Sequence, residues 1–225
     1  MLKNVINKLF TALFISGLTI HANAASILNG DFETCDFTGW NLASTDNPIP
    51  TGDFTMSNTP NGCAATVKID ASLAIANILY QEVDFSVAAD SALRLTLDFS
   101  VDTTQPRLDI GTADYFDIYF NDGAGNLYDH TGELGGMYNS MDITGADSFR
   151  HSFRLDEMFN NHTGWFLEFQ INSNFDELAS SITINEVQLF DVSNVDTPPT
   201  LPLLLSGLLL LGVINKSNWE KRNEI

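Results

Sequence analysis

The chain has 225 residues and a mass of 24.7 kDa, and its hydrophobic content of 44% with 11% aromatic residues excludes a disordered or collagen-like protein. The formal net charge at pH 7 is −19, and five of the ten basic residues lie in the end segments, residues 1–24 and 196–225. The part between them is therefore strongly acidic. We expect no nucleic-acid partner, because phosphate binding needs a basic patch. An acidic shell suits divalent cations, neutral ligands or no particular partner.

Residues 1–24 have the three parts of a secretory signal peptide. An early pair of lysines precedes an apolar run over residues 9–20, and the small-residue sequence Ala-Asn-Ala ends at Ala24. We predict cleavage by signal peptidase after Ala24, since an uncleaved anchor would need a longer apolar run. Export would place the rest of the chain in an oxidising compartment.

Cys35 and Cys63 are the two cysteines of the chain. An even number in an exported chain predicts one disulfide, worth roughly 3–4 kcal/mol on the chain-entropy model. Two free buried thiols are the alternative. A catalytic cysteine is not expected, because no histidine lies nearby in the sequence to activate a thiolate.

Residues 201–214 form an uncharged Leu- and Gly-rich run that is followed by Lys216 and the pair Lys221 and Arg222. As a helix this run would be about 21 Å long, shorter than the roughly 30 Å hydrocarbon core, so it predicts a short transmembrane helix with the basic tail in the cytoplasm. A buried core helix is the alternative, although prolines set the segment apart. The predicted organisation is a signal peptide (1–24), one domain (25–195) and a C-terminal sorting segment (196–225).

Alternating hydrophobic and polar residues dominate the middle of the chain. Residues 91–101, 115–120 and 165–171 each have apolar side chains at every second position, the pattern of strands with one buried face. Short strands separated by Gly, Asn and Asp predict an all-β fold, an antiparallel β-sandwich of the jelly-roll kind.

The last strand, residues 182–192, changes its alternation near Asn185 and Glu186. Ile182 and Ile184 share one parity, whereas Val187 and Leu189 share the other, which predicts a β-bulge. The alternative is a regular strand with residues 190 and 192 turned inward.

The C-terminal segment resembles a known sorting signal. Residues 195–200 read Val-Asp-Thr-Pro-Pro-Thr, and the Leu/Gly run and a short basic tail follow. This order is similar to the signal of PEP-CTERM proteins, the bacterial exosortase substrates. The resemblance implies an exosortase-type processing enzyme, membrane attachment, and a final place in the cell envelope or extracellular matrix.

The middle of the chain also resembles a family. Several stretches are similar to galactose-binding-like jelly rolls of carbohydrate-binding modules. They are Leu-Asn-Gly-Asp-Phe-Glu at residues 28–33, Phe-Thr-Gly-Trp at 37–40, the pair of strands 79–83 and 93–96, and Ile-Asn-Glu-Val-Gln-Leu at 184–189. In such modules acidic residues of the first and closing strands commonly hold a structural calcium ion. The resemblance therefore implies calcium, and the candidate ligands are Asp31, Glu33, Asn185 and Glu186. Solvated acidic residues at strand ends are the alternative.

Binding of a glycan requires exposed aromatic rings beside polar groups. Tyr115, Asp117 and Tyr119 share one face of a predicted strand and meet this requirement, and Tyr128 and Tyr138 are further candidates for the same face. Cross-strand packing of tyrosines is the alternative. Trp40 and Trp165 are predicted in the core.

Catalytic signals are poor, since the chain has no GxSxG elbow, Gly-rich phosphate loop or HExxH helix. The sequence thus predicts an exported bacterial cell-surface or extracellular-matrix protein that binds extracellular polysaccharide without catalysis. A structural or adhesion protein with no defined sugar site and a polysaccharide-acting enzyme are the alternatives.

Overall fold

A computed structural model describes residues 25–46, 48–60, 62–70, 74–88, 91–103, 114–139, 145–173 and 179–193. The predicted signal peptide (1–24) and sorting segment (196–225) lie outside these residues. The chain divides into a unit of Met1–Val192, which holds the strands described below, and a unit of Ser193–Ile225, of which the structure describes only Ser193. In the described part, no helix is both long and apolar enough to cross a membrane.

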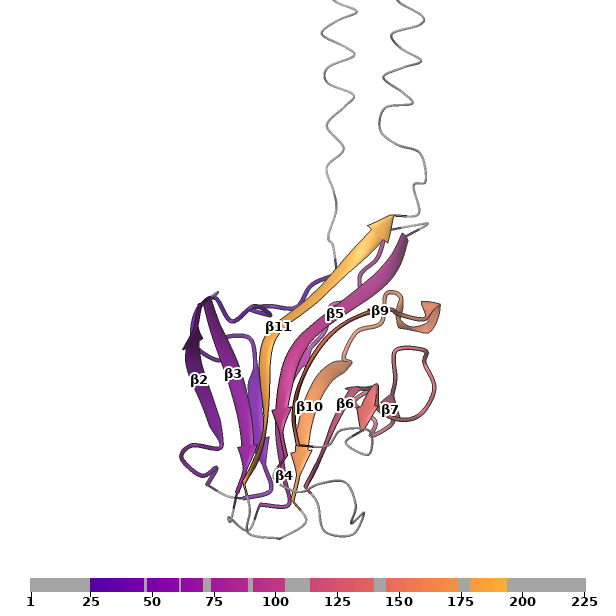
Figure 1. The fold of residues 1–225 in the computed structure, drawn as a ribbon. Helices are drawn as coiled ribbons and strands as arrows, with labels where there is room; N and C mark the ends of the chain where they lie inside the picture. Colours follow the sequence, from indigo (N-terminus) through magenta and orange to yellow (C-terminus); the bar gives the residue numbers. More distant parts are fainter. Residues whose placement is uncertain are drawn as a thin grey trace, which may run out of the picture. The chain divides into compact units, whose positions relative to one another are not determined.

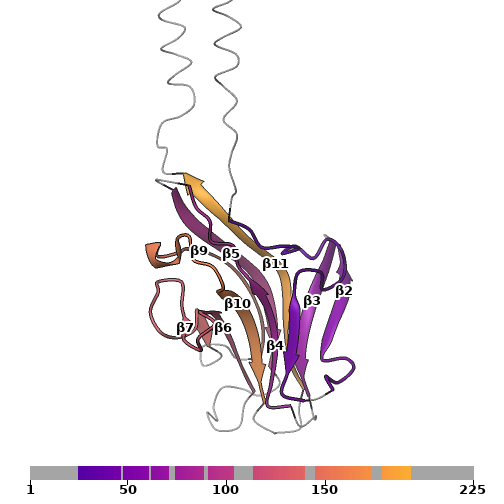
Figure 2. The same ribbon diagram turned by 180° about the vertical axis from the view of Figure 1, so that it is seen from behind.

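Two sheets of antiparallel strands form the fold, which confirms the predicted all-β sandwich (Figures 1 and 2). Sheet 1 has the order β1-β4-β10-β6-β7, with β8 also paired to β6, and its strands are β1 (Asn41–Ser44), β4 (Ala76–Glu82), β6 (Tyr115–Asn121), β7 (Leu127–Tyr128), β8 (Tyr138–Asn139) and β10 (Phe166–Asn172). Sheet 2 has the order β2-β3-β11-β5-β9, and its strands are β2 (Phe54–Thr59), β3 (Gly62–Ile69), β5 (Ser91–Asp102), β9 (Ala146–Arg154) and β11 (Ser180–Ser193). The neighbouring strands β5 and β11 are the longest and extend together past the rest of their sheet (Figure 1).

The predicted alternation places the core between the two sheets. The inward-facing apolar positions of β5, β6 and β10 are all at most 3% exposed: Leu93, Leu95, Leu97, Phe99, Val101, Phe116, Ile118, Phe120, Leu167, Phe169 and Ile171. Aromatic side chains join the layers, as in the edge-to-face contact of Phe99 on β5 with Phe116 on β6 at 6.1 Å between ring centroids. Trp40 and Trp165 are buried in this core, as predicted.

The predicted bulge in β11 is confirmed by the burial of its side chains. Ile182, Ile184, Val187 and Leu189 are all buried at the core, although the two pairs have opposite parity. This is possible because one extra residue at positions 185–186 returns the later half of the strand to the core.

The N-terminal segment is held against both sheets. Cys35 and Cys63 form the predicted disulfide, with 5.3 Å between their Cα atoms, which ties this segment to the start of β3. The amide of Val187 donates to the carbonyl of Gly30 at 2.7 Å, and a Cβ atom on Gly30 would lie 2.1 Å from the Val187 carbonyl oxygen. Residue 30 is therefore a glycine because only a residue without a side chain fits this close approach.

Candidate functional site

The predicted binding residues lie on the outer side of sheet 1. Because Phe116, Ile118 and Phe120 point into the core, the alternate residues Tyr115, Asp117 and Tyr119 of β6 point away from it. The structure places all three on one face, as the alternation requires.

Neighbouring strands add residues to this face that the sequence did not identify. The register places Tyr119 opposite Glu168, and Glu168 opposite Tyr80; Asp117 lies opposite Gln170, and Tyr115 opposite Asn172. We call this surface the tyrosine face and define it by the outward residues of β4, β10 and β6: Ile78, Tyr80, Glu82, Phe166, Glu168, Gln170, Asn172, Tyr115, Asp117, Tyr119 and Asn121.

Aromatic rings on three adjacent strands remain accessible on the tyrosine face. Tyr115 on β6 is 46% exposed, and Tyr80 on β4 and Phe166 on β10 are half-buried. Tyr80 and Phe166 form an edge-to-face pair with 5.8 Å between ring centroids. Tyr80 and Tyr115 lie two strands apart across the sheet and four residues apart along it, a separation of roughly 16 Å at the usual strand spacing and rise per residue. The face therefore offers aromatic surface at both sides of a central strand.

Hydrogen bonds fix the polar side chains between these rings. The Tyr119 hydroxyl donates to Gln170 Oε1, and Gln170 Nε2 donates to Asn172 Oδ1. Asn121 Nδ2 donates to Glu168 Oε1 at 3.0 Å. Asn172 is 4% exposed, and among the described residues its Nδ2 has no hydrogen-bond partner. The row of hydrogen bonds thus ends at a side-chain amide whose N–H groups are not used as donors, which is uncommon for a buried group.

The tyrosine face is acidic, and the pKa values of two of its carboxyl groups, Asp117 and Glu168, are raised. Burial raises the pKa of Asp117 to about 6. Burial also raises the pKa of Glu168, against the opposing effects of the hydrogen bond from Asn121 and of the nearby Tyr119 hydroxyl. The pKa of Tyr119 rises through burial and through the neighbouring carboxyl of Glu168, so its hydroxyl stays protonated as a donor. The described strands of sheet 1 contain no lysine or arginine. An anionic ligand would thus meet carboxylates with no cation to balance it.

Two other tyrosines that were candidates for this face lie elsewhere. Tyr128 on β7 stacks on Trp165 with 5.1 Å between ring centroids. Tyr138 on β8 packs edge-to-face against Phe99 at 5.1 Å, and its hydroxyl pairs with His151 Nδ1. Both tyrosines have inward parity on their strands, because their partners on β6 are the buried Phe120 and Ile118. Their inclusion in the binding face was wrong.

The four candidate calcium ligands do not converge. Asp31 and Glu33 line a pocket of about 520 Å³ beside residues 187–190 of β11. Asn185 Nδ2 instead donates to Asp98 at 2.9 Å, and the Glu186 carboxylate contacts Arg150 at 3.3 Å. Within the described residues, no three His, Cys, Asp or Glu side chains are arranged to hold a metal ion. The bulge turns both Asn185 and Glu186 to the outer side of sheet 2, so these residues do not fit the calcium site that the resemblance implied.

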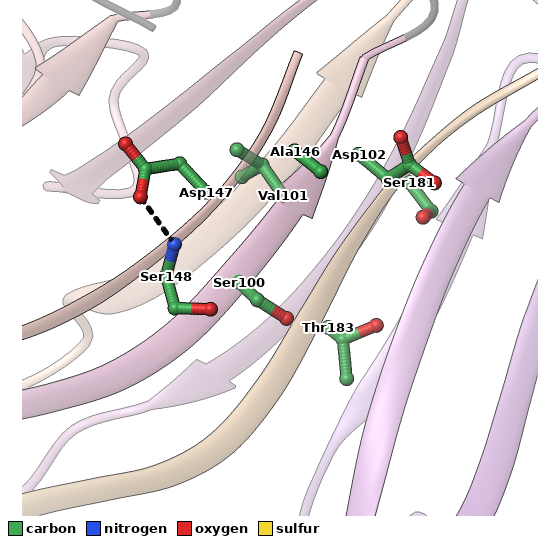
Figure 3. Close-up of a pocket in the computed structure, with 8 residues that line it drawn as sticks. All are labelled: Ser100, Val101, Asp102, Ala146, Asp147, Ser148, Ser181 and Thr183. Carbon is green, nitrogen blue, oxygen red and sulfur yellow. Dashed lines mark hydrogen bonds between the residues drawn. The ribbon is translucent and has the colours of Figure 1, made fainter.

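A second polar pocket lies on the outer side of sheet 2 (Figure 3). It has a volume of about 450 Å³ between β5, β9 and β11, and its lining residues are Ser100, Val101, Asp102, Ala146, Asp147, Ser148, Ser181 and Thr183. The Asp147 carboxylate accepts a hydrogen bond from the Ser148 amide at 2.8 Å. The pocket has hydroxyl groups but no aromatic ring, so it lacks the stacking surface of the tyrosine face.

Comparison with known proteins gives no family. No protein-family model and no curated protein matches the chain. Solved structures similar to part of it include CBM28, a carbohydrate-binding module specific for non-crystalline cellulose (14% identity, 73% of this chain and 94% of that chain, TM-score 0.47). The module TmCBM61, solved in complex with β-1,4-galactotriose, is 15% identical over 73% of this chain and 97% of that chain, with a TM-score of 0.45.

The enzymatically active domain of tailspike protein 4 from bacteriophage CBA120 is also similar, at 16% identity over 74% of this chain and a TM-score of 0.47. The chain spans only 21% of the length of that structure. Because all three TM-scores lie below 0.5, the assignment of a function rests on the residues of this chain.

Proposed function

We propose that the domain is a noncatalytic glycan-binding module and that the tyrosine face is its binding surface. The observation that carries this proposal is the arrangement of Tyr80, Tyr115 and Phe166, aromatic rings with accessible surface, around a hydrogen-bonded row of polar side chains. A pyranose ring has an apolar C–H side that stacks on an aromatic ring and hydroxyl groups at its rim. Apolar and aromatic contacts combined with a small number of precisely placed polar groups are what such recognition needs.

The polar row supports hydrogen bonds of both kinds. Among the described residues Asn172 Nδ2 has no partner. The half-buried carboxyl group of Asp117 would accept from a sugar hydroxyl, whereas Glu168 is only 8% exposed. Since the face has no cation in its described strands, the proposal favours a neutral glycan over a uronate or a sulfated chain.

Affinity electrophoresis of the full-length chain in gels that contain soluble β-glucan, galactan or galactomannan tests the proposal. We expect retardation by at least one neutral polysaccharide and a two- to tenfold loss of affinity in Tyr115→Ala, about the value of one aromatic stacking contact. Tyr115→Phe should retain binding, because the ring remains. Leu134→Ala, at a 74% exposed position outside the tyrosine face, is the control for surface substitution.

Two results would contradict this assignment. No retardation by any polysaccharide would favour a structural or adhesion role without a sugar site. Release of reducing sugar that disappears in Glu168→Gln would show an enzyme, since two carboxyl groups on one face are also the minimum for glycoside hydrolysis.

We further propose that the protein is exported and processed as its end segments suggest. Signal peptidase would cleave after Ala24, and an exosortase-type enzyme would act at the segment 196–225, leaving the domain in the cell envelope or extracellular matrix. The Cys35–Cys63 disulfide supports an oxidising compartment. N-terminal sequencing of protein from the cell surface should begin at Ala25, and an intact Met1 on cytosolic protein would contradict export.

A structural calcium ion also stays a prediction, now without a matching set of side chains.

A further inference from the structure

The outer side of sheet 2 collects the positively charged side chains of the described residues. Every lysine and arginine of the described residues lies on it: Lys68, Arg94, Arg150 and Arg154. All four have outward parity, since Val67, Leu93, Phe149 and Phe153 beside them point toward the core. We call this surface the arginine face. The tyrosine face, on the other sheet, points away from it across the core.

Two of these four cations are paired with carboxylates. Lys68 Nζ lies 3.4 Å from Asp70. Arg150 lies 3.8 Å from Asp98 and 3.3 Å from Glu186. In so acidic a chain, a basic residue is expected to form an ion pair with a nearby carboxylate in this way.

Arg94 and Arg154 have a different surrounding. They are directly opposite each other in the register of β5 and β9, although like charges at such positions repel. Among the described residues, neither guanidinium forms an ion pair with a carboxylate. Arg94 Nη1 donates to Ser152 Oγ at 3.2 Å, and this hydroxyl also accepts from Thr96 Oγ1 at 3.2 Å. Ser152 therefore keeps its own hydroxyl proton for a further acceptor.

We propose that Arg94, Arg154 and Ser152 bind a carboxylate or sulfate group of an acidic polysaccharide. An anion between the two guanidinium groups would replace their repulsion by charge-assisted hydrogen bonds, and arginine suits planar, bidentate recognition of a carboxylate. Along β5 and β9 the same face continues with the hydroxyl groups of Thr96, Ser100 and Ser148, which are partners for sugar hydroxyls. The site is separate from the tyrosine face and does not depend on it.

Charge favours a glycan over an acidic segment of a second copy of the chain. A second copy would bring a whole domain of the same sign, because the chain carries a net charge of −19. A thin glycan chain meets mainly the local cations, since charges more than about 8 Å away are screened at physiological ionic strength. We therefore commit to the glycan.

Matched probes test the site in the full-length chain. Dextran sulfate and polygalacturonate are compared with dextran and methyl-esterified polygalacturonate, which have the same backbones without the negative charge. We expect binding of one or both acidic probes, weakened by salt, and binding of neither neutral counterpart at this face. The sulfate and carboxylate arms identify which group is bound.

Single substitutions locate the binding. Arg94→Gln and Arg154→Gln should each reduce affinity for the acidic probe about tenfold, as expected for loss of charge-assisted hydrogen bonds. Lys68→Gln, on the same face but already paired, should leave it nearly unchanged, and thermal melting checks that each variant folds. Tyr115→Ala should retain acidic binding, so failure of this site and failure of the tyrosine face are distinguishable.

Three outcomes would overturn the inference. The first is no binding of either acidic probe. The second is an equal loss of affinity in Lys68→Gln, which would indicate diffuse attraction of the acidic probe to all the basic residues. The third is concentration-dependent self-association in sedimentation that Arg154→Gln abolishes. The last would assign the arginine pair to contact with a second copy.

Discussion

Asp117 shows how the position of one side chain in a sheet sets its acidity. Its carboxyl group points outward on β6, yet neighbouring side chains shield it, and burial raises its pKa to about 6 from an ordinary value of 3.8. The folded protein therefore favours the protonated form. The stabilisation is complete below about pH 4 and is lost as the pH rises through about 6.

Asp117→Asn should remove this pH dependence. We expect the free energy of unfolding of the variant, relative to the unsubstituted protein, to increase between pH 4 and pH 7 by up to about 3 kcal/mol. Urea unfolding at pH 4, 5.5 and 7 measures the difference. Leu134→Ala, at an exposed position with no titratable group, should show no comparable trend. A difference that stays constant across this range would contradict the burial of Asp117.

Gln81 performs a structural role on the inner side of the same sheet. Its side chain is 4% exposed and pairs with the backbone of Leu28 twice: Oε1 accepts from the amide at 2.6 Å, and Nε2 donates to the carbonyl at 2.9 Å. The amide group thus replaces a neighbouring strand and holds the N-terminal segment to β4.

Gln81→Ala should destabilise the fold by about 2–4 kcal/mol, because two backbone groups lose their partners in a partly buried place. Gln81→Glu retains the acceptor and should cost less at a pH where the carboxylate accepts from Leu28 N. Chemical unfolding gives both values. Equal stability of Gln81→Ala and the unsubstituted chain would show that water replaces these bonds without cost.

At the scale of elements, local sequence patterns predicted the strands correctly, whereas contacts between strands could not be predicted from them. The alternation in residues 91–101 predicted β5 to within one residue of its bounds, Ser91–Asp102, and the parity change in β11 predicted the bulge. Both depend on neighbours in the chain. Tyr80 and Phe166 were missed because only the register of β4 and β10 brings them beside β6, and register is not visible in a single strand.

The same reason explains why the four candidate calcium ligands do not lie together. The resemblance identified Asn185 and Glu186 by their place in the sequence, whereas the bulge and the neighbouring β5 and β9 set the partners of their side chains, Asp98 and Arg150. A polar side chain that already has a partner on a neighbouring strand is not free to bind a metal ion, and that partner cannot be read from the residue's place in the sequence.

The disulfide is an element-scale constraint whose value can be measured. Cys35 and Cys63 are 28 residues apart, so reduction should lower the free energy of unfolding by about 3–4 kcal/mol on the chain-entropy model. Unfolding with and without dithiothreitol gives the difference, and Cys35→Ser with Cys63→Ser should reproduce the reduced protein. A loss below about 1 kcal/mol would mean that the N-terminal segment is held by its other contacts, such as Gln81 with Leu28.

At the scale of the whole molecule, the two outer faces differ in charge and in chemistry. Sheet 1 presents aromatic rings and carboxyl groups without a described cation, and sheet 2 presents all the described lysines and arginines among hydroxyl groups. The apolar core between them keeps the faces apart, so a ligand on one leaves the other free. On the two binding proposals together, the domain would join two polysaccharide chains of different charge.

Bridging is the consequence of both proposed faces acting together. Mixed with a neutral polysaccharide that the tyrosine face binds and with polygalacturonate coupled to beads, the full-length chain should carry the neutral polymer into the bead pellet. Calcium-free buffer prevents gelation of the acidic polymer by the metal. Tyr115→Ala and Arg154→Gln should each abolish this transfer, because each removes one attachment and leaves the other intact. The two variants mixed together should not restore it, since no single molecule then holds both chains. Transfer that persists in either variant would show that one face binds both polymers.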